Sequence, residues 1–196
     1  MKQFSAGKVG AEPRWRIGHG LRPAGLSDAM AEWLFDGESL TKRLRQASAG
    51  DFRVKLLQQR FERPLLSERR ALGLGERDYA LVRQVHLYCG GEIKVYARTV
   101  MPLALLRGGT RGLARLGGRP LGEMLFRDKS MRREPMQVAR INPGDLFFSS
   151  GVPGGVTDQV WGRRSVFRLS GKPLLVNEIF LPPVPGSTGF RIKHKV

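Results

Sequence analysis

One glutamate stands in the middle of an otherwise apolar stretch near the end of the chain. The stretch LLVNEIFL, residues 174–181, has the composition of a buried β-strand. Side chains alternate between the two faces of a strand, so Glu178 shares its face with Leu174, Val176 and Phe180. A carboxylate without a partner on such a face is strongly unfavourable. We therefore expect either a cationic partner inside the protein or a binding site whose floor is this face.

Two arginines raise a similar question on an earlier hairpin. The glycines at 90–91 separate two β-like runs and predict a two-residue turn, with Cys89 paired to Glu92. In that register Arg83 lies directly opposite Arg98, and both point to the same face. Two like charges among apolar neighbours are destabilising unless an anion joins them, and an arginine can bind a carboxylate through two parallel hydrogen bonds. The hairpin therefore indicates a site for a small anion.

Two alternatives remain open at this point. Arg83 and Glu178 could form a buried ion pair with each other, which would explain both residues without any ligand. One glutamate, however, cannot neutralise two arginines. A register shift of a single residue would instead place Arg83 and Arg98 on opposite faces of the sheet.

The elements that must position these residues are strands joined by short turns, with helices between them. Ser27 and Ser39 have the spacing of N-caps of two short helices. We expect strands at 52–61, 78–89, 92–102, 163–170 and 174–182, short helices at 102–126, and part strand, part long loop at 127–160. The last two strands form a hairpin whose turn we place at 171–173. This order predicts an α+β fold, an antiparallel sheet covered by helices.

Length and composition indicate one globular domain. The chain has 196 residues, of which 41% are hydrophobic and 26% charged, and it shows no internal repeat. We expect a flexible basic segment at 1–24, a domain at 25–183 with an extended insertion at 127–160, and a C-terminal tail at 184–196.

The net charge of +17 is the most unusual feature of the composition. The arginines are scattered rather than clustered, so we expect a solvated basic surface and no specific nucleic-acid site. A single cysteine, Cys89, excludes an intrachain disulfide framework, and three histidines do not indicate a metal site. No apolar run reaches the length of a membrane span and no secretory signal is evident, so we expect a cytoplasmic protein.

Four stretches of the chain resemble the bacterial chorismate pyruvate-lyase family. They follow the family's order from about Trp33 to Pro182, and the last is the most specific. They are ESLTKRL, ARTVMP, GRPLGEMLF and WGRRSVFRLSGKPLLVNEIFLP. The resemblance implies a lyase that splits chorismate into 4-hydroxybenzoate and pyruvate, the first committed step of ubiquinone biosynthesis, without a metal or organic cofactor.

The resemblance also implies a fold and a set of site residues. The fold is an antiparallel sheet with helical flaps over an internal ligand site. Arg83 falls on the arginine that holds the substrate's ring carboxylate, and Glu178 on the buried acid at the opposite end. Leu40 and Leu121 fall on two apolar lining positions; Leu40 stands where relatives often have methionine, a swap of similar size. Each follows a predicted helix cap, so its backbone N–H suits an anionic oxygen while its side chain can wall a ring.

Other roles stay open beside this one. Arg98 is a weaker candidate for the second carboxylate of chorismate. The main alternative to an enzyme is a ligand-sensing module of the same fold that binds an aromatic acid without turnover; a nucleic-acid-binding protein is a second. Our expectation is a monomer whose partners are chorismate and 4-hydroxybenzoate.

Overall fold

The computed structural model describes residues 10–18, 23–154, 156 and 158–185. Within this part of the chain, strands form one antiparallel sheet. Their bounds are β1 (Arg16–Ile17), β2 (Phe52–Glu62), β3 (Ala80–Cys89), β4 (Glu92–Pro102), β5 (Arg132–Arg133), β6 (Gln137–Ile141), β7 (Val160–Leu169) and β8 (Lys172–Phe180). The α+β class with an antiparallel sheet, predicted from the sequence, is confirmed.

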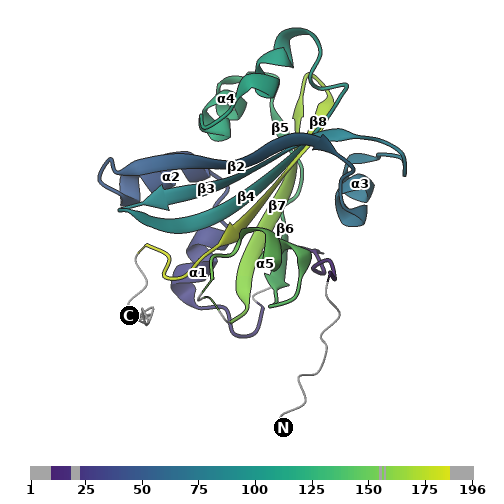
Figure 1. Cartoon of the computed structure of the whole chain (residues 1–196). Coiled ribbons are helices and arrows are strands. Elements are labelled where there is room, and N and C mark those ends of the chain that lie inside the picture. Colours follow the sequence, from purple (N-terminus) through teal and green to yellow (C-terminus); the bar gives the residue numbers. More distant parts are fainter. Residues whose placement is uncertain (1–9, 19–22, 155, 157, 186–196) are drawn as a thin grey trace.

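The strands follow the order β1-β6-β7-β8-β4-β3-β2, and β5 pairs with β7 outside this path. The sheet is strongly twisted, so that β2, β3 and β4 run across the view of Figure 1 whereas β6 and β7 run down it. β2 lies at one end of the sheet, and its pairing with β3 is irregular between Leu56 and Gln58. The central positions belong to β7, β8, β4 and β3.

Helices lie between the strands along the chain. They are α1 (Asp28–Leu34), α2 (Leu40–Ala47), α3 (Leu66–Leu72), the 3-10 helix η1 (Gly108–Arg115), α4 (Leu121–Arg127) and α5 (Leu146–Gly151). The predicted caps of the first two are confirmed: the Ser27 hydroxyl accepts from the Met30 N–H, and the Ser39 hydroxyl accepts from the Lys42 N–H. The helix α3 was not predicted, and α5 replaces part of the loop expected at 127–160.

The segment 127–160 belongs to the sheet as well as to its surface. It contributes β5, β6 and α5, and β6 lies between β1 and β7. The N-terminal segment is also partly ordered: β1 pairs with β6, and the Gly18 N–H donates to the Met136 carbonyl at 2.9 Å. Residues 10–18 thus contain backbone pairing although they lack side-chain periodicity, and the flexible segment expected at 1–24 stays a prediction. Residues 1–9, 19–22 and 186–196 lie outside the described residues, and the boundaries at 25 and 183 stay predictions.

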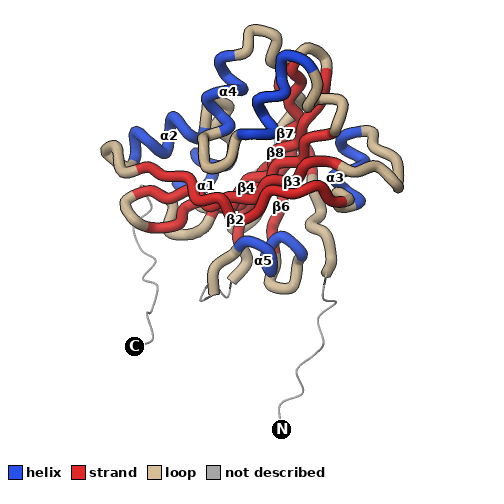
Figure 2. The backbone as a smooth tube through the Cα atoms, turned by 45° about the horizontal axis from the view of Figure 1, so that its top comes forward, coloured by secondary structure: helices blue, strands red, loops and turns tan. Residues whose placement is uncertain are grey.

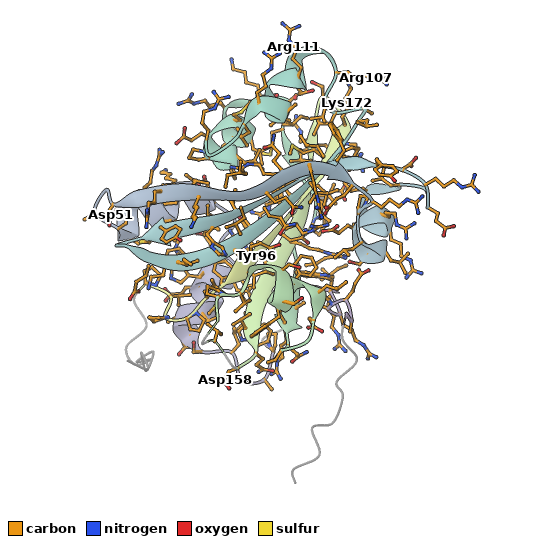
Figure 3. The ribbon with its side chains drawn as sticks, viewed as in Figure 1. Asp51, Tyr96, Arg107, Arg111, Asp158 and Lys172 are labelled. Atoms are coloured by element: carbon orange, nitrogen blue, oxygen red, sulfur yellow. The ribbon has the colours of Figure 1, made fainter. Side chains whose placement is uncertain are left out.

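Helices cover both faces of the sheet (Figure 2). We call the face under α1, α2, η1 and α4 the front face, and the face under α3 and α5 the back face. Leu44 of α2 and Leu125 of α4 pack into the front core clusters, whereas Leu72 of α3 packs on the back. Tyr96, labelled in Figure 3, points to the back face and packs against α5, where Gly151 leaves no room for a Cβ beside the tyrosine ring.

A buried charge network on the back face joins α3 to the sheet. Glu68 of α3 is fully buried and binds Arg98 of β4 through both carboxylate oxygens, at 2.9 and 3.1 Å. Arg98 also donates to Glu62 of β2 at 3.0 Å, and the Asn177 side chain of β8 donates to Glu68 at 3.1 Å. Removing one member of such a network leaves an uncompensated charge in the interior.

We predict that Glu68→Ala lowers the free energy of unfolding by about 3–5 kcal/mol, because Arg98 then loses its bidentate partner while staying buried. Glu134→Ala is the matched control: it removes the partner of Arg168 from an exposed ion pair of 2.7 Å, worth about 1 kcal/mol or less. Urea unfolding at neutral pH measures both variants. Equal shifts of the urea midpoints of the two variants would contradict the prediction that the back-face network stabilises the fold more than an exposed ion pair does.

Candidate active site

A cavity opens between the front face of the sheet and the helices α2 and α4. Empty space of about 590 Å³, including open solvent at the mouth, lies among its lining residues. All four residues singled out in the sequence line it: Leu40, Arg83, Leu121 and Glu178. They come from two helices and two strands. The fold therefore brings together residues as far apart in the sequence as positions 40 and 178.

Arg83 of β3 is a buried cation without an acidic partner among the described residues. Only 2% of its surface is exposed, and it donates to two backbone carbonyls, those of Gly117 and Arg119, each at 2.9 Å. No carboxylate of a described residue lies within ion-pair distance of it. Burial lowers the pKa of Arg83 to about 10, which still leaves the guanidinium protonated at neutral pH. A buried positive charge balanced only by neutral groups favours an anion.

The expected pairing of Arg83 with Arg98 is wrong. The Gly90-Gly91 turn and the Cys89–Glu92 pair form as predicted, but a β-bulge between Leu87 and Tyr88 shifts the register. Arg83 therefore lies opposite Thr99, while Arg98 points to the back face and binds glutamates there. One inserted residue exchanges the two faces of a strand, so every side chain beyond the bulge changes sides. Arg98 is thereby removed as a candidate for the second carboxylate.

The cationic partner of Glu178 is Arg163, not Arg83. The two residues are direct neighbours on β8 and β7, and the Arg163 Nε donates to Glu178 Oε2 at 2.6 Å. Arg163 is 1% exposed and also donates to the carbonyls of Trp33 and Asp36, at 3.1 and 2.6 Å. No described residue donates a hydrogen bond to the other oxygen, Oε1 of Glu178. Glu178 is thus held from one side and lines the cavity with the other.

Sequence reasoning missed Arg163, although the signal for it was present. The turn of the last hairpin consists of Ser170 and Gly171, and Ser170 has a positive φ of 48°. Counting outward from this turn places Arg163 directly opposite Glu178. The turn expected at 171–173 displaced the register and hid the pair. Arg133 of β5, a third arginine that lines the cavity, was not anticipated either.

Leu40 and Leu121 form the roof of the cavity. Each is the first residue of its helix, α2 or α4, and each is buried, at 5% and 7% exposure. The starts of the two helices lie close together, since a Cβ added at Gly122 would lie 3.0 Å from the Thr41 hydroxyl. The roof is therefore apolar in its side chains, while first-turn N–H groups lie beside them.

The cavity is polar at its ends and apolar between them. On the floor, Arg83 lies opposite Thr99, whereas Glu178 lies opposite Ala97, two residues away along β4 on the same face. Standard strand spacings put the Cα atoms of Arg83 and Glu178 roughly 12 Å apart. The lining between them is mainly apolar and includes Val85, Leu87, Ala97, Leu125, Phe167 and Val176. This arrangement suits a flat, apolar molecule with a carboxylate at one end and a hydrogen-bonding group at the other.

Solved structures of similar fold include a transcriptional regulator and a domain of a repressor. A transcriptional regulator of the GntR family from Bacillus cereus matches with a TM-score of 0.51 and 14% identity, over 72% of this chain and 99% of that one. The effector-binding domain of the trehalose repressor from B. subtilis matches with a TM-score of 0.50 and 11% identity, over 73% and 99%. At these identities the likeness concerns the fold alone.

Relatives in sequence are far more similar. A protein of Methylococcus capsulatus is 41% identical over 155 residues, 79% of this chain and 96% of its own length, and one of Thiobacillus denitrificans is 45% identical over 152 residues, 76% and 81%. Both carry the name "Probable chorismate pyruvate-lyase". The family model described as chorismate lyase matches residues 15–187. The chain therefore belongs to the chorismate lyase family.

Proposed function

We propose that the front-face cavity is the place where this chain converts chorismate to 4-hydroxybenzoate and pyruvate. The chain is a lyase of this family, and its reaction is the first committed step of ubiquinone biosynthesis. The observation that carries the assignment to the cavity is Arg83, a buried guanidinium without a carboxylate partner among the described residues. Arg83 and Glu178 line the same cavity.

The reaction breaks one bond and moves one hydrogen. Chorismate is a dianion with a carboxylate at ring carbon C1, an enolpyruvyl ether at C3 and a hydroxyl at C4. The C3–O bond breaks, the hydrogen at C4 leaves, and the ring becomes aromatic, which drives the reaction. The enolpyruvyl methylene gains a hydrogen and becomes the methyl group of pyruvate, so that no atom is left over and no external oxidant is needed.

Arg83 and Glu178 suit the two ends of this substrate. The Arg83 guanidinium binds the C1 carboxylate, because an arginine can offer two parallel N–H groups to one carboxylate. Glu178 accepts a hydrogen bond from the C4 hydroxyl through Oε1, the oxygen that Arg163 does not occupy. Arg163 fixes the orientation of the carboxylate from the side. Glu178 can then orient the hydroxyl or assist the movement of a proton.

Leu40 and Leu121 close the site from above. Their side chains pack against the ring faces, and the backbone N–H groups at the starts of α2 and α4 add positive character near bound oxygen atoms. A dry cavity strengthens the interactions between charged groups inside it.

The surroundings of the enzyme are a separate part of the proposal. No helix among the described residues is long and apolar enough to cross a membrane. We place the protein in the cytoplasm as a monomer, with chorismate and 4-hydroxybenzoate as its partners and no specific nucleic acid. The charge of +17 then belongs to its solvated surface.

The proposed function is tested by incubating the purified chain with chorismate. Chromatography measures 4-hydroxybenzoate and a coupled lactate dehydrogenase assay measures pyruvate, and the two products should appear in equal amounts. Binding of 4-hydroxybenzoate without turnover of chorismate would instead identify a ligand-sensing module, the class to which the fold neighbours belong.

We predict that Arg83→Ala abolishes most turnover, and that Arg83→Lys restores little of it because lysine cannot reproduce the planar pair of N–H groups. The loss of one charge-assisted carboxylate interaction corresponds to about 10- to 100-fold in kcat/KM. Arg111→Ala is the control, since this exposed arginine lies on η1 at the edge of the molecule (Figure 3). Near-normal turnover by Arg83→Ala would remove Arg83 from the site.

For Glu178→Gln, the size of the rate loss decides between two roles. A group that transfers a proton contributes about 10²–10⁴-fold, so kcat should fall by that amount if Glu178 does so. A much smaller loss is expected if Glu178 only orients the hydroxyl and the C4 hydrogen passes directly to the enolpyruvyl methylene. Thermal melting, measured together with the initial rates, distinguishes these two roles from a loss of stability caused by weakening the ion pair between Glu178 and Arg163. A stable variant with normal turnover would exclude Glu178 from the reaction.

A further inference from the structure

The second carboxylate of chorismate has no partner in the site described so far. This carboxylate belongs to the enolpyruvyl group, which is attached at C3, next to the C4 hydroxyl. With Arg83 on the C1 carboxylate and Glu178 on the hydroxyl, the enolpyruvyl group must lie at the Glu178 end of the cavity. A cation is needed there, because a carboxylate buried without a partner is strongly unfavourable.

Three arginines line the cavity, and two of them are already engaged. Arg83 lies at the opposite end. Arg163 is 1% exposed, and it donates through Nε to Glu178 and through Nη1 to the Trp33 and Asp36 carbonyls. The charge of Arg163 is already balanced by Glu178, and Arg83 is assigned to the C1 carboxylate. Arg133 remains.

Within the described part of the chain, the groups that hold Arg133 in place are neutral. Its Nε donates to the Ser165 hydroxyl and its Nη1 to the Gly37 carbonyl, each at 2.9 Å. Its guanidinium lies over the Phe167 ring, 5.2 Å from the ring centre. No carboxylate of a described residue lies within ion-pair distance of Arg133, and its Nη2 makes no hydrogen bond to a described residue. A positioned guanidinium whose Nη2 amino group is available to a ligand therefore borders the cavity.

Arg133 also lies at the correct end. Its partner Ser165 is two residues from Arg163 on β7, on the same face of that strand. Burial lowers the pKa of Arg133 and the charge of Arg163 lowers it further, whereas Glu178 and Asp36 raise it, so Arg133 lies close enough to these groups to interact with their charges. Among the carboxylates near Arg133, Glu178 is paired with Arg163 and Asp36 with Arg43, so the positive charge of Arg133 is available to an additional carboxylate.

We infer that Arg133 binds the carboxylate of the enolpyruvyl group and holds it beside the C3 ether bond. The inference rests on the proposed function of the cavity. Arg133 and Arg83 then bind the two carboxylates of the substrate from opposite ends, and only Arg83 still has its ligand once pyruvate has separated. Arg133 therefore distinguishes the dianionic substrate from the monoanionic aromatic product.

The test compares two ligands in one variant. Arg133→Met keeps the length of the side chain without its charge, and it should lower kcat/KM for chorismate by about 10- to 100-fold. The Kd of 4-hydroxybenzoate, measured by calorimetry, should stay within about twofold, because this ligand has no enolpyruvyl carboxylate. Arg132→Met is the matched control: Arg132, the other residue of β5, is exposed and donates only to backbone carbonyls, so both quantities should stay at their wild-type values.

A merely structural Arg133 would give a different pattern. If it only fastens β5 to Ser165 and Gly37, Arg133→Met should weaken both ligands in parallel and lower the melting temperature, which would overturn the inference. Unchanged kcat/KM in a folded variant would overturn it as well. Should Arg133→Met fail to fold, Arg133→Lys decides, because it keeps the charge and should weaken chorismate by about 3- to 10-fold while leaving 4-hydroxybenzoate unaffected. Absence of turnover in the wild-type chain would contradict the proposed function instead, whatever the variants do.

Discussion

The β-bulge between β3 and β4 determines which arginine faces the cavity. Because the register shifts at Leu87 and Tyr88, Arg83 lies on the front face and Arg98 on the back. The two arginine side chains then have different roles on the two faces of the sheet. Arg83, without a carboxylate partner, is available to an anion, whereas Arg98 joins α3 to the central strands through Glu68. Without the bulge, both guanidinium groups would crowd the front face, and the fully buried Glu68 would lose its cation.

Much of the fold and the core of the candidate site could be predicted from local patterns. Serine caps marked the first two helices, and alternating side chains marked the long strands, because these signals lie within a few residues of one another. Arg83 and Glu178 were recognisable as charges on apolar strand faces, which is an unfavourable placement unless something compensates it. The resemblance to a known family added Leu40 and Leu121, whose apolar character alone could not separate them from ordinary core residues.

The remaining features depend on contacts between distant residues. The first N–H groups of α3, at Leu66 and Ser67, are bound by the carboxylate of Glu12, each at 2.8 Å, so the cap of this helix lies more than fifty positions upstream. No local pattern could reveal that helix, or the order in residues 10–18 that supplies its cap. The position of a β-bulge likewise cannot be predicted from the alternation of side chains along a strand. Arg133 and Arg163 acquire their roles only through pairing across β7, which follows from the register and not from composition.

The position of β2 at the end of the sheet has a consequence for the behaviour of the protein at high concentration. Among the described strands β2 pairs only with β3, so its other edge leaves backbone N–H and C=O groups open to a strand from another molecule. Arg53 and Lys55 are exposed along this strand, and its pairing is irregular between Leu56 and Gln58. Two copies placed edge to edge would bring like charges together on an uneven ladder. Arg53 and Lys55 would therefore oppose self-association along this edge, an effect independent of the reaction proposed for the cavity.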